Sequence, residues 1–208
     1  MHFSLINTLF NFVLLTSKNY NIDESHGIKH SMDVHYYASK LYECELPLNP
    51  KLLKHDNIIF TSAIIHDMCD KKYMDEKDGI NNIKDFLNNK LNKDEINVVL
   101  DIISTMSYST VKKKGFPDLG EYQHAYHIVR EADLLASYDL DRCIIYQMLK
   151  SKSNYEDSIK IAIDLFENRV FKYNNEKLFT TKYGKLMSNE LHKASIKRIN
   201  TLKKFYKL

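Results

Sequence analysis

The strongest constraint on the fold of this chain is the recurrence of apolar residues at every third or fourth position over long segments. This spacing places the apolar side chains on one face of an α-helix. Only 5 glycines and 3 prolines occur in 208 residues, so the sequence offers few positions at which a helix must stop. Sustained alternation of apolar and polar residues, which would indicate a half-buried strand, does not occur. The sequence therefore predicts an all-α bundle of seven to nine helices.

Short polar segments separate the predicted helices. The helices cover about residues 3–17, 26–43, 53–67, 93–106, 121–137, 139–151, 155–172 and 182–206, with a loop and a short helix over 68–90. The stretch 107–120, which contains Gly115 and Pro117, is expected to be a loop. The chain has no linker rich in Gly or Ser, and its length suits one domain over residues 1–208.

Charge and cysteine content narrow the class of protein. The net charge of +3 is too small to indicate binding to nucleic acid, and no such partner is expected. Cys44, Cys69 and Cys143 are far apart in the sequence and form no CxxC motif. Such isolated cysteines favour reduced thiols in an intracellular protein over a disulfide framework.

The N-terminal segment MHFSLINTLFNFVLLTSKNY is apolar enough for a signal peptide to be considered. It lacks a basic region at its start and a small-residue cleavage site. It is also short for a membrane span. We therefore interpret it as a helix that packs into the core, and we expect a cytoplasmic protein without membrane association.

A histidine and an aspartate stand at the end of the most apolar predicted helix. The sequence IIFTSAIIHDMCD is apolar nearly all round from Ile58 to Ile65, which indicates a buried helix. His66 and Asp67 follow directly. A buried, ionised aspartate is costly unless hydrogen bonds or a cation compensate its charge. A divalent metal ion would provide that compensation.

Two further segments place polar side chains on apolar faces. Stepping back by four residues from Val34 leads to His30 and then to His26, so both extend an inward face. In HIVREADLLASYD, Asp133 is surrounded by apolar residues as a second buried carboxylate. His30, His66, Asp67 and Asp133 together form a mixed N/O ligand set, which suits Mn, Fe, Co, Ni or Zn better than Ca.

The segments SHGIKHSMDV, SAIIHDMCDKKY and VREADLLASYD resemble the HD superfamily of metal-dependent phosphohydrolases, and in particular its small nucleotide-hydrolysing members. The resemblance covers roughly residues 20–150, and helices over about 155–206 would pack on this core. It implies a helical HD-type domain with one divalent ion, which His30, His66, Asp67 and Asp133 would hold. Mn²⁺ is favoured, and Fe²⁺, Co²⁺, Ni²⁺, Zn²⁺ or Mg²⁺ are alternatives. The implied activity is hydrolysis of a phosphate ester or anhydride in a nucleotide-like substrate.

Further residues near these motifs are candidates for catalysis and substrate binding. Asp70, one turn beyond His66, would orient or deprotonate the attacking water, beside the catalytic ligands His66 and Asp67. The groups expected to bind the substrate phosphate are His26, Lys71, Lys72, Arg130 and His127, with His124 on the same helix as the last two.

Each of these candidates also has a structural interpretation. Asp70 would then cap a turn or pair with Lys71 or Lys72, and Arg130 would form a salt bridge with Glu131 or Asp139. His26 would only start a helix, and His124 and His127 would lie at the surface or the edge of the core. Tyr108 and Tyr122 are candidates to stack on a nucleobase.

Two alternative functions stay open at this point. One is a phosphodiesterase acting on a cyclic nucleotide or dinucleotide, with a second metal ion held by His124 or His127. The other is a catalytically inactive HD-fold protein that binds a ligand without turnover. In each case the expected partner is a small phosphorylated molecule, and a homodimer is left open.

Overall fold

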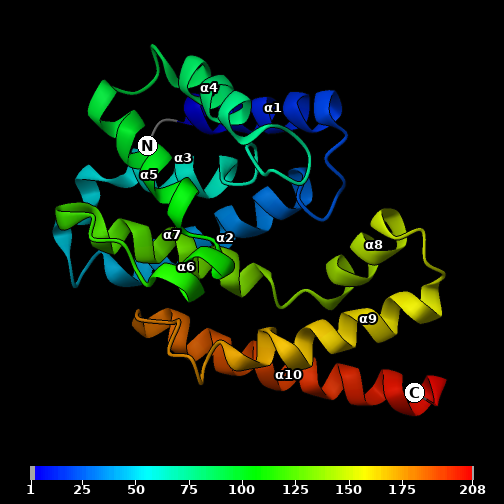
Figure 1. Ribbon diagram of the computed structural model, residues 1–208. Coiled ribbons are helices and arrows are strands. Elements are labelled where there is room, and N and C mark those ends of the chain that lie inside the picture. The colour runs from blue at the N-terminus through cyan, green and yellow to red at the C-terminus, as the bar shows by residue number, and fades with distance from the viewer. Residues whose placement is uncertain (1–2, 208) are drawn as a thin grey trace.

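Ten α-helices follow one another along residues 3–207, the part of the chain that this computed structural model describes (Figure 1). They are α1 Phe3–Tyr20, α2 Ile28–Glu45, α3 Asp56–Ile65, α4 Glu76–Leu87, α5 Lys93–Thr105, α6 Tyr108–Lys114, α7 Gln123–Ala136, α8 Leu140–Lys150, α9 Tyr155–Asn168 and α10 Lys182–Tyr206. Short 3₁₀ turns cover Pro50–Lys54, Gly120–Tyr122 and Val170–Lys172. Within these residues there is no strand, and the predicted all-α class is confirmed.

Side-chain caps determine where many of these helices begin. Asn92 accepts a hydrogen bond from the backbone of Glu95 at 2.9 Å, and the Glu95 carboxylate accepts one from the backbone of Asn92 at 3.0 Å. This reciprocal pair satisfies backbone N–H groups that the first turn of α5 leaves free. The other helices that begin with a side-chain cap are α4, α6, α8, α9 and α10.

The structure corrects the prediction in two places. The stretch 107–120 is not entirely a loop, because Tyr108–Lys114 forms α6, and the helices therefore outnumber the seven to nine expected. Ser107 caps α6 by accepting from the backbone of Thr110 at 3.2 Å, and Gly115 ends it with a φ of 76°. The helix predicted over 155–172 ends at Asn168, where Arg169 leaves the helical conformation.

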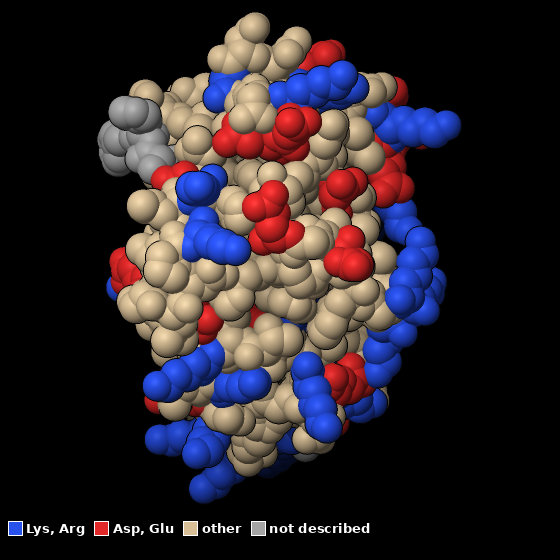
Figure 2. All heavy atoms as spheres, turned by 90° about the vertical axis from the view of Figure 1, so that its left-hand side faces the viewer, with Lys and Arg blue, Asp and Glu red and all other residues tan. Residues whose placement is uncertain are grey.

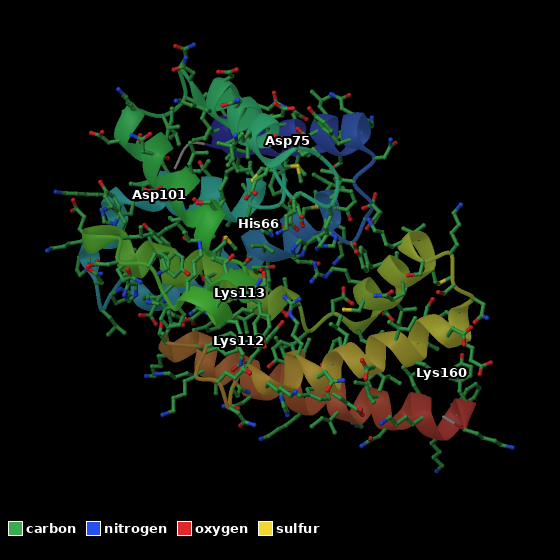
Figure 3. The ribbon with its side chains drawn as sticks, in the orientation of Figure 1. His66, Asp75, Asp101, Lys112, Lys113 and Lys160 are labelled. Atoms are coloured by element: carbon green, nitrogen blue, oxygen red, sulfur yellow. The ribbon has the colours of Figure 1, made fainter. Side chains whose placement is uncertain are left out.

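Helix α3 lies at the centre of the bundle and contacts α1, α2, α5 and α7. Ile58, Ile59, Ile64 and Ile65 are 0–1% exposed, as the apolar sequence predicts. Full burial of such a side chain contributes about 1.5–3 kcal/mol, so this helix holds its neighbours together. The residue that follows it, His66, consequently lies inside the bundle, whereas the labelled lysine of α9 lies at the periphery (Figure 3).

The C-terminal helices lie along one side of the motif-bearing helices (Figure 1). Helix α9 packs on α8, and α10 contacts α2 and α7. The start of α10 is tied to α7 by the buried Glu131 carboxylate, which accepts from the backbones and hydroxyls of Thr180 and Thr181. The carboxylate of Glu45 accepts from the backbone of Lys182 at 3.1 Å. These contacts fix the C-terminal layer against the helices that carry the predicted site.

None of the helices described is both long enough and apolar enough to cross a bilayer. Figure 2 shows the face that lies at the left of Figure 1. Acidic side chains gather in its upper half, and basic ones gather along its lower part and right edge. The two signs of charge are therefore mixed on this face, and it presents no uniformly basic surface.

Candidate metal centre

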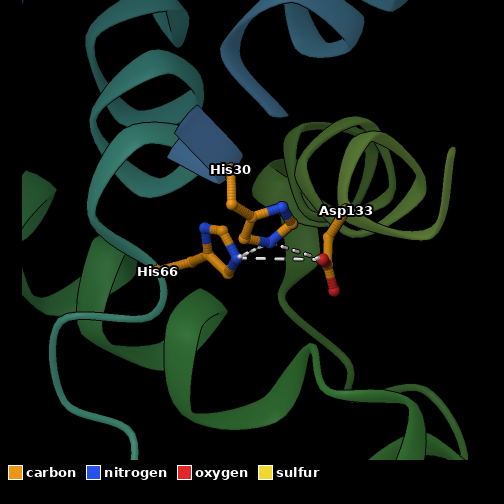
Figure 4. A group of neighbouring side chains, drawn as sticks. All are labelled: His30, His66 and Asp133. Carbon is orange, nitrogen blue, oxygen red and sulfur yellow. Dashed lines mark hydrogen bonds and ion pairs between the residues drawn. The ribbon is translucent and has the colours of Figure 1, made fainter. Parts of the chain in front are cut away.

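Three separate parts of the chain bring four polar side chains together in the interior. His30 lies in the first turn of α2, His66 and Asp67 directly follow α3, and Asp133 lies near the end of α7. These three helices contact one another, so their polar positions meet where the helices cross. Figure 4 shows His30, His66 and Asp133 converging on one point.

The distances between the four side chains resemble those between neighbouring ligands of one ion. Nε2 of His30 lies 3.2 Å from Nε2 of His66, 3.5 Å from Oδ2 of Asp67 and 3.3 Å from Oδ1 of Asp133. Nε2 of His66 lies 3.4 Å and 3.8 Å from the same two oxygens. Metal–ligand bonds of about 2.0–2.2 Å at tetrahedral or octahedral angles separate neighbouring ligand atoms by roughly 3–3.5 Å. The ligand atoms of His30, His66 and Asp133 all lie within 4.8 Å of one another, so these three could hold a first-row divalent ion after small adjustments. Asp67 is not part of this mutual set and adjoins it through the two histidines.

The imidazole of His66 has the orientation that a metal ligand requires. Its Nδ1 lies 3.0 Å from the carbonyl oxygen of Ala63, to which it donates a proton. Once Nε2 has lost its proton, its lone pair points toward the cluster, and such a hydrogen bond on the opposite nitrogen is the usual support of a ligating histidine. His30 also directs Nε2 into the cluster, while its buried Nδ1 finds no partner among residues 3–207.

Burial and charge act differently on the two imidazoles. Burial lowers the pKa of His30 to about 4, and the positive charge of Arg142 adds to this shift. Burial also opposes charge on His66, but Asp67 and Asp133 outweigh it and raise the pKa of His66 to about 9. In both aspartates burial favours the neutral acid, yet the imidazoles hold the pKa of each carboxyl well below its usual range. The cluster thus keeps two carboxylates ionised, and a cation in the position of the proton would stabilise them further.

A cavity of about 330 Å³ opens beside the cluster. His30, Asp67 and Asp133 form one of its walls. The rest of its lining includes side chains of α6, of α8 and of the segment after α9, namely Tyr108, Arg142, Tyr146, Arg169 and Tyr173. A small molecule in this cavity would therefore meet the metal ligands as well as cationic and aromatic side chains.

A second, smaller hollow of about 210 Å³ reaches the cluster from another side, along the segment after α3. Its lining includes His66, Asp67, Asp70, Lys71 and Lys72. Both spaces are lined in part by the same residues, namely Asp67, Lys72, Ser107 and Asp133. The cluster is therefore accessible from two directions, although His30 and His66 are themselves buried.

Besides the metal ligands, the structure brings four of the predicted catalytic and substrate-binding residues to these spaces. His26 and Lys72 line the larger cavity, and Asp70 and Lys71 line the smaller hollow. Asp70 also accepts from the backbone of Lys72 at 2.9 Å and lies 3.2 Å from its ammonium group, as the structural alternative expected. The turn after Asp67 thus folds back so that Lys72 reaches His26, at 3.0 Å.

Arg130 does not reach either space, which corrects the expectation that it contacts the substrate phosphate. Its side chain is buried at 1% exposure, donates to the carbonyl oxygen of Leu178 and lies 3.4 Å from the Glu131 carboxylate. The guanidinium also covers the ring of Phe116, 4.6 Å from its centroid. Arg130 therefore belongs to the packing between α7 and the segment before α10.

The structure also separates His124 and His127 from the cluster. Nε2 of His124 lies 3.0 Å from the carboxylate of Glu45. The ring of His127 lies against Phe116, with centroids 5.1 Å apart, and contacts Gln123 at 3.2 Å. Neither histidine lines the cavity or the smaller hollow, so His127 is not placed to contact a substrate there as expected.

Several residues of the site escaped the prediction. Asp23, Ser25 and Tyr73 form a hydrogen-bonded group around His26: Tyr73 donates to Asp23 at 2.7 Å, and the Ser25 hydroxyl lies 2.7 Å from Nδ1 of His26. The sequence predicts only a polar turn there, and nothing in it links Tyr73 to Asp23. Arg142 and Tyr146 of α8 were also missed, although their four-residue spacing places them on one helix face.

Of the two tyrosines that were candidates for base stacking, Tyr108 lines the cavity. Tyr122 packs instead on His55, with ring centroids 4.8 Å apart, on another part of the surface.

Comparison with known proteins gives a fold and no family. No family model matches the chain, and no curated protein matches it. Among solved structures, the chain is similar to a Lactobacillus plantarum protein determined by crystallography as a structural-genomics target. That structure has a TM-score of 0.72 and 16% sequence identity, and the match covers 99% of this chain and 98% of the other. The two proteins therefore share the arrangement of their helices over nearly their whole length.

Proposed function

We propose that this chain is a metal-dependent phosphohydrolase of the HD superfamily that cleaves a phosphate ester or anhydride in a nucleotide-like substrate. The observation that carries the proposal is the meeting of His30, His66, Asp67 and Asp133, with five pairs of ligand atoms 3.2–3.8 Å apart. The order of these residues along the chain is that of the superfamily pattern. The adjoining cavity, lined by cationic side chains, supports a phosphorylated substrate.

One divalent ion, Mn²⁺ for preference, would be held by these four side chains. Bound there, it would polarise a phosphoryl group and lower the pKa of water toward neutrality. Fe²⁺, Co²⁺, Ni²⁺, Zn²⁺ and Mg²⁺ are alternatives, because a mixed N/O site does not select strongly among them.

The chain's own residues would bind the phosphate and move protons around it. Lys72 is half-exposed at the cavity, and its ammonium group can transfer from Asp70 and His26 to a phosphate oxygen. This transfer would free Nε2 of His26 to hold a proton at the cavity wall. Asp70, in the smaller hollow, is suited to orient water or accept its proton once Lys72 has moved.

The placement of the remaining histidines speaks against the phosphodiesterase alternative. A second ion was expected to recruit His124 or His127, and both are engaged away from the cluster. The inactive ligand-binding alternative keeps the same site and differs only in turnover, so an activity measurement decides it.

We also infer an intracellular location and a small-molecule partner. The three cysteines are free thiols, and Cys69 and Cys143 are buried, which supports a reducing compartment such as the cytoplasm.

The test is a screen for release of phosphate and of pyrophosphate from nucleoside mono-, di- and triphosphates, with Mn²⁺, Co²⁺, Mg²⁺, Ni²⁺ and Zn²⁺ in turn. We expect turnover only with an added ion. Asp67→Asn, which keeps the size of the side chain, should lower the rate by about a thousandfold or more, because it weakens the metal site.

The matched control is Asp85→Asn, which changes an exposed aspartate of α4 and should keep the wild-type rate. A folded protein that binds Mn²⁺ but turns over none of these substrates would overturn the enzymatic proposal in favour of the ligand-binding alternative.

A further inference from the structure

Two arginines line the same cavity as the metal cluster and form no ion pair with a carboxylate among the described residues. Arg142 lies in the first turn of α8, and Arg169 directly follows α9. Both line the cavity that is also lined by His30, Asp67 and Asp133. Within residues 3–207, neither guanidinium forms an ion pair with a carboxylate, whereas Arg130 and Arg198 lie next to Glu131 and Asp141.

Arg142 is the more enclosed of the two arginines. Its Nη1 donates to the backbone carbonyl of Ser25 at 2.9 Å, which fixes the guanidinium beside the turn that carries His26. Its Nε is buried and has no hydrogen-bond partner among the described residues. A buried donor without an acceptor is costly, so this group is suited to an acceptor that a ligand supplies.

Arg169 is held by aromatic side chains that leave its outer edge available. Nε donates to the hydroxyl of Tyr173 at 3.2 Å, and the guanidinium lies over the ring of Tyr108, 4.5 Å from its centroid. These two contacts fix the plane of the group without neutralising its charge. A guanidinium so oriented can form paired hydrogen bonds with a phosphate.

The side chains that line the cavity do not balance all of its positive charges. A divalent ion would compensate the carboxylates of Asp67 and Asp133, and Lys72 would bind the first phosphoryl group as it leaves Asp70. Arg142 and Arg169 then remain as two positive charges in the cavity lining. A substrate with a single phosphate, bound at the ion, would leave both of them uncompensated in a partly enclosed space.

We propose that the substrate carries two phosphoryl groups, one bound at the metal cluster and the other bound by Arg142 and Arg169 in the same cavity. This inference rests on the proposed function, since it takes the first phosphoryl group to lie at the ion. The substrate class is thus a diphosphate, a triphosphate or a bisphosphate, and a simple monophosphate ester is a poor ligand.

Binding of two non-hydrolysable compounds tests this directly. Methylphosphonate has one phosphonate group, and propane-1,3-bisphosphonate has two. Isothermal titration calorimetry with the Mn²⁺-loaded protein should give an affinity at least about tenfold higher for the bisphosphonate, as expected for added charge-assisted hydrogen bonds. Arg142→Gln and Arg169→Gln should each reduce this preference for the bisphosphonate. The double variant should bind the bisphosphonate at most about twofold more tightly than methylphosphonate. In all three variants the affinity for methylphosphonate should stay within about twofold of the wild-type value.

Arg198→Gln is the matched control, because Arg198 is an exposed arginine of α10 outside the cavity. Arg169 is exposed, so its variant is expected to fold even if the loss of the Ser25 contact destabilises the Arg142 variant. Equal affinities of the wild-type protein for the two compounds, or a preference that survives in the double variant, would overturn the inference alone. Failure of methylphosphonate to bind in a Mn²⁺-dependent way would instead overturn the proposed function, and the inference with it.

Discussion

The ammonium nitrogen of Lys72 lies 3.0 Å from Nε2 of His26, and this contact determines where the histidine carries its proton. An ammonium group can only donate hydrogen bonds, so Nε2 must accept. Burial lowers the pKa of His26, which keeps the ring neutral at pH 7. The single ring proton is therefore on Nδ1, which lies 2.7 Å from the Ser25 hydroxyl and 3.1 Å from that of Tyr73. Both hydroxyls donate onward to Asp23.

The first prediction is that His26 is a neutral imidazole protonated at Nδ1 at pH 7. The hydroxyls of Ser25 and Tyr73 both donate their hydrogen to the Asp23 carboxylate. Their oxygens can therefore accept a hydrogen bond from Nδ1 of His26 but have no hydrogen left to donate to it. Long-range ¹H–¹⁵N spectra of labelled protein distinguish the two tautomers and the imidazolium. Asp23→Asn and Tyr73→Phe should each increase the fraction protonated at Nε2. Observation of that tautomer as the main form in the wild-type protein would contradict this assignment.

The second prediction concerns the buried carboxylate that joins α7 to α10. Glu131 is fully buried and accepts hydrogen bonds from both the backbones and the hydroxyls of Thr180 and Thr181. Glu131→Gln replaces an acceptor oxygen by an NH₂ donor that faces these donors. We expect the free energy of unfolding to fall by about 3 kcal/mol, the size typical of breaking a buried charged contact.

Urea unfolding measures this loss, with Glu190→Gln on the exposed side of α10 as the control. A change below about 1 kcal/mol for the buried variant would show that Glu131 does not hold the layers together.

The third prediction links His127 to stability in mild acid. Burial, followed by the charge of Arg130, lowers the pKa of His127 from the ordinary 6.5 to about 4. Between these two values the unfolded chain binds a proton that the folded protein does not. The free energy of unfolding therefore falls as the pH is lowered from about 6.5 to about 4.

His127→Gln, which cannot become charged, should show a weaker loss of stability over this interval. Chemical unfolding at pH 7.5 and at several lower values compares the two proteins. Parallel curves for the variant and the wild type would contradict the assignment of a buried neutral His127.

The helices were predictable from the sequence because their signals are local. The range 182–206 agrees with α10, and the apolar run from Ile58 to Ile65 identifies the central helix. Helix α6 was missed because Gly115 and Pro117 dominate that stretch, although Ser107 is a good capping residue. The end of α9 was placed too late because Arg169 leaves the helical conformation, and its guanidinium packs on Tyr108, which is distant in sequence.

The candidate site was predictable only where polar residues interrupt apolar faces. His30, His66 and Asp133 carry that signal, and the structure brings them together. Arg130 was misassigned because it precedes Asp133 by three residues, and a shared helix face suggested a shared site. Its long side chain instead crosses to Leu178. Arg142 carries no comparable signal, since an arginine on an amphipathic helix usually faces solvent.

The most direct test of the metal centre is a titration of the metal-free protein with Mn²⁺, in which electron paramagnetic resonance measures the concentration of unbound Mn²⁺ at each step. We predict one tightly bound Mn²⁺ per chain, and an affinity at least about 100-fold lower in His66→Gln and in Asp133→Asn than in the Asp85→Asn control. The absence of Mn²⁺ binding, or equal affinities in the two cluster variants and the control, would contradict the proposal that these side chains hold an ion.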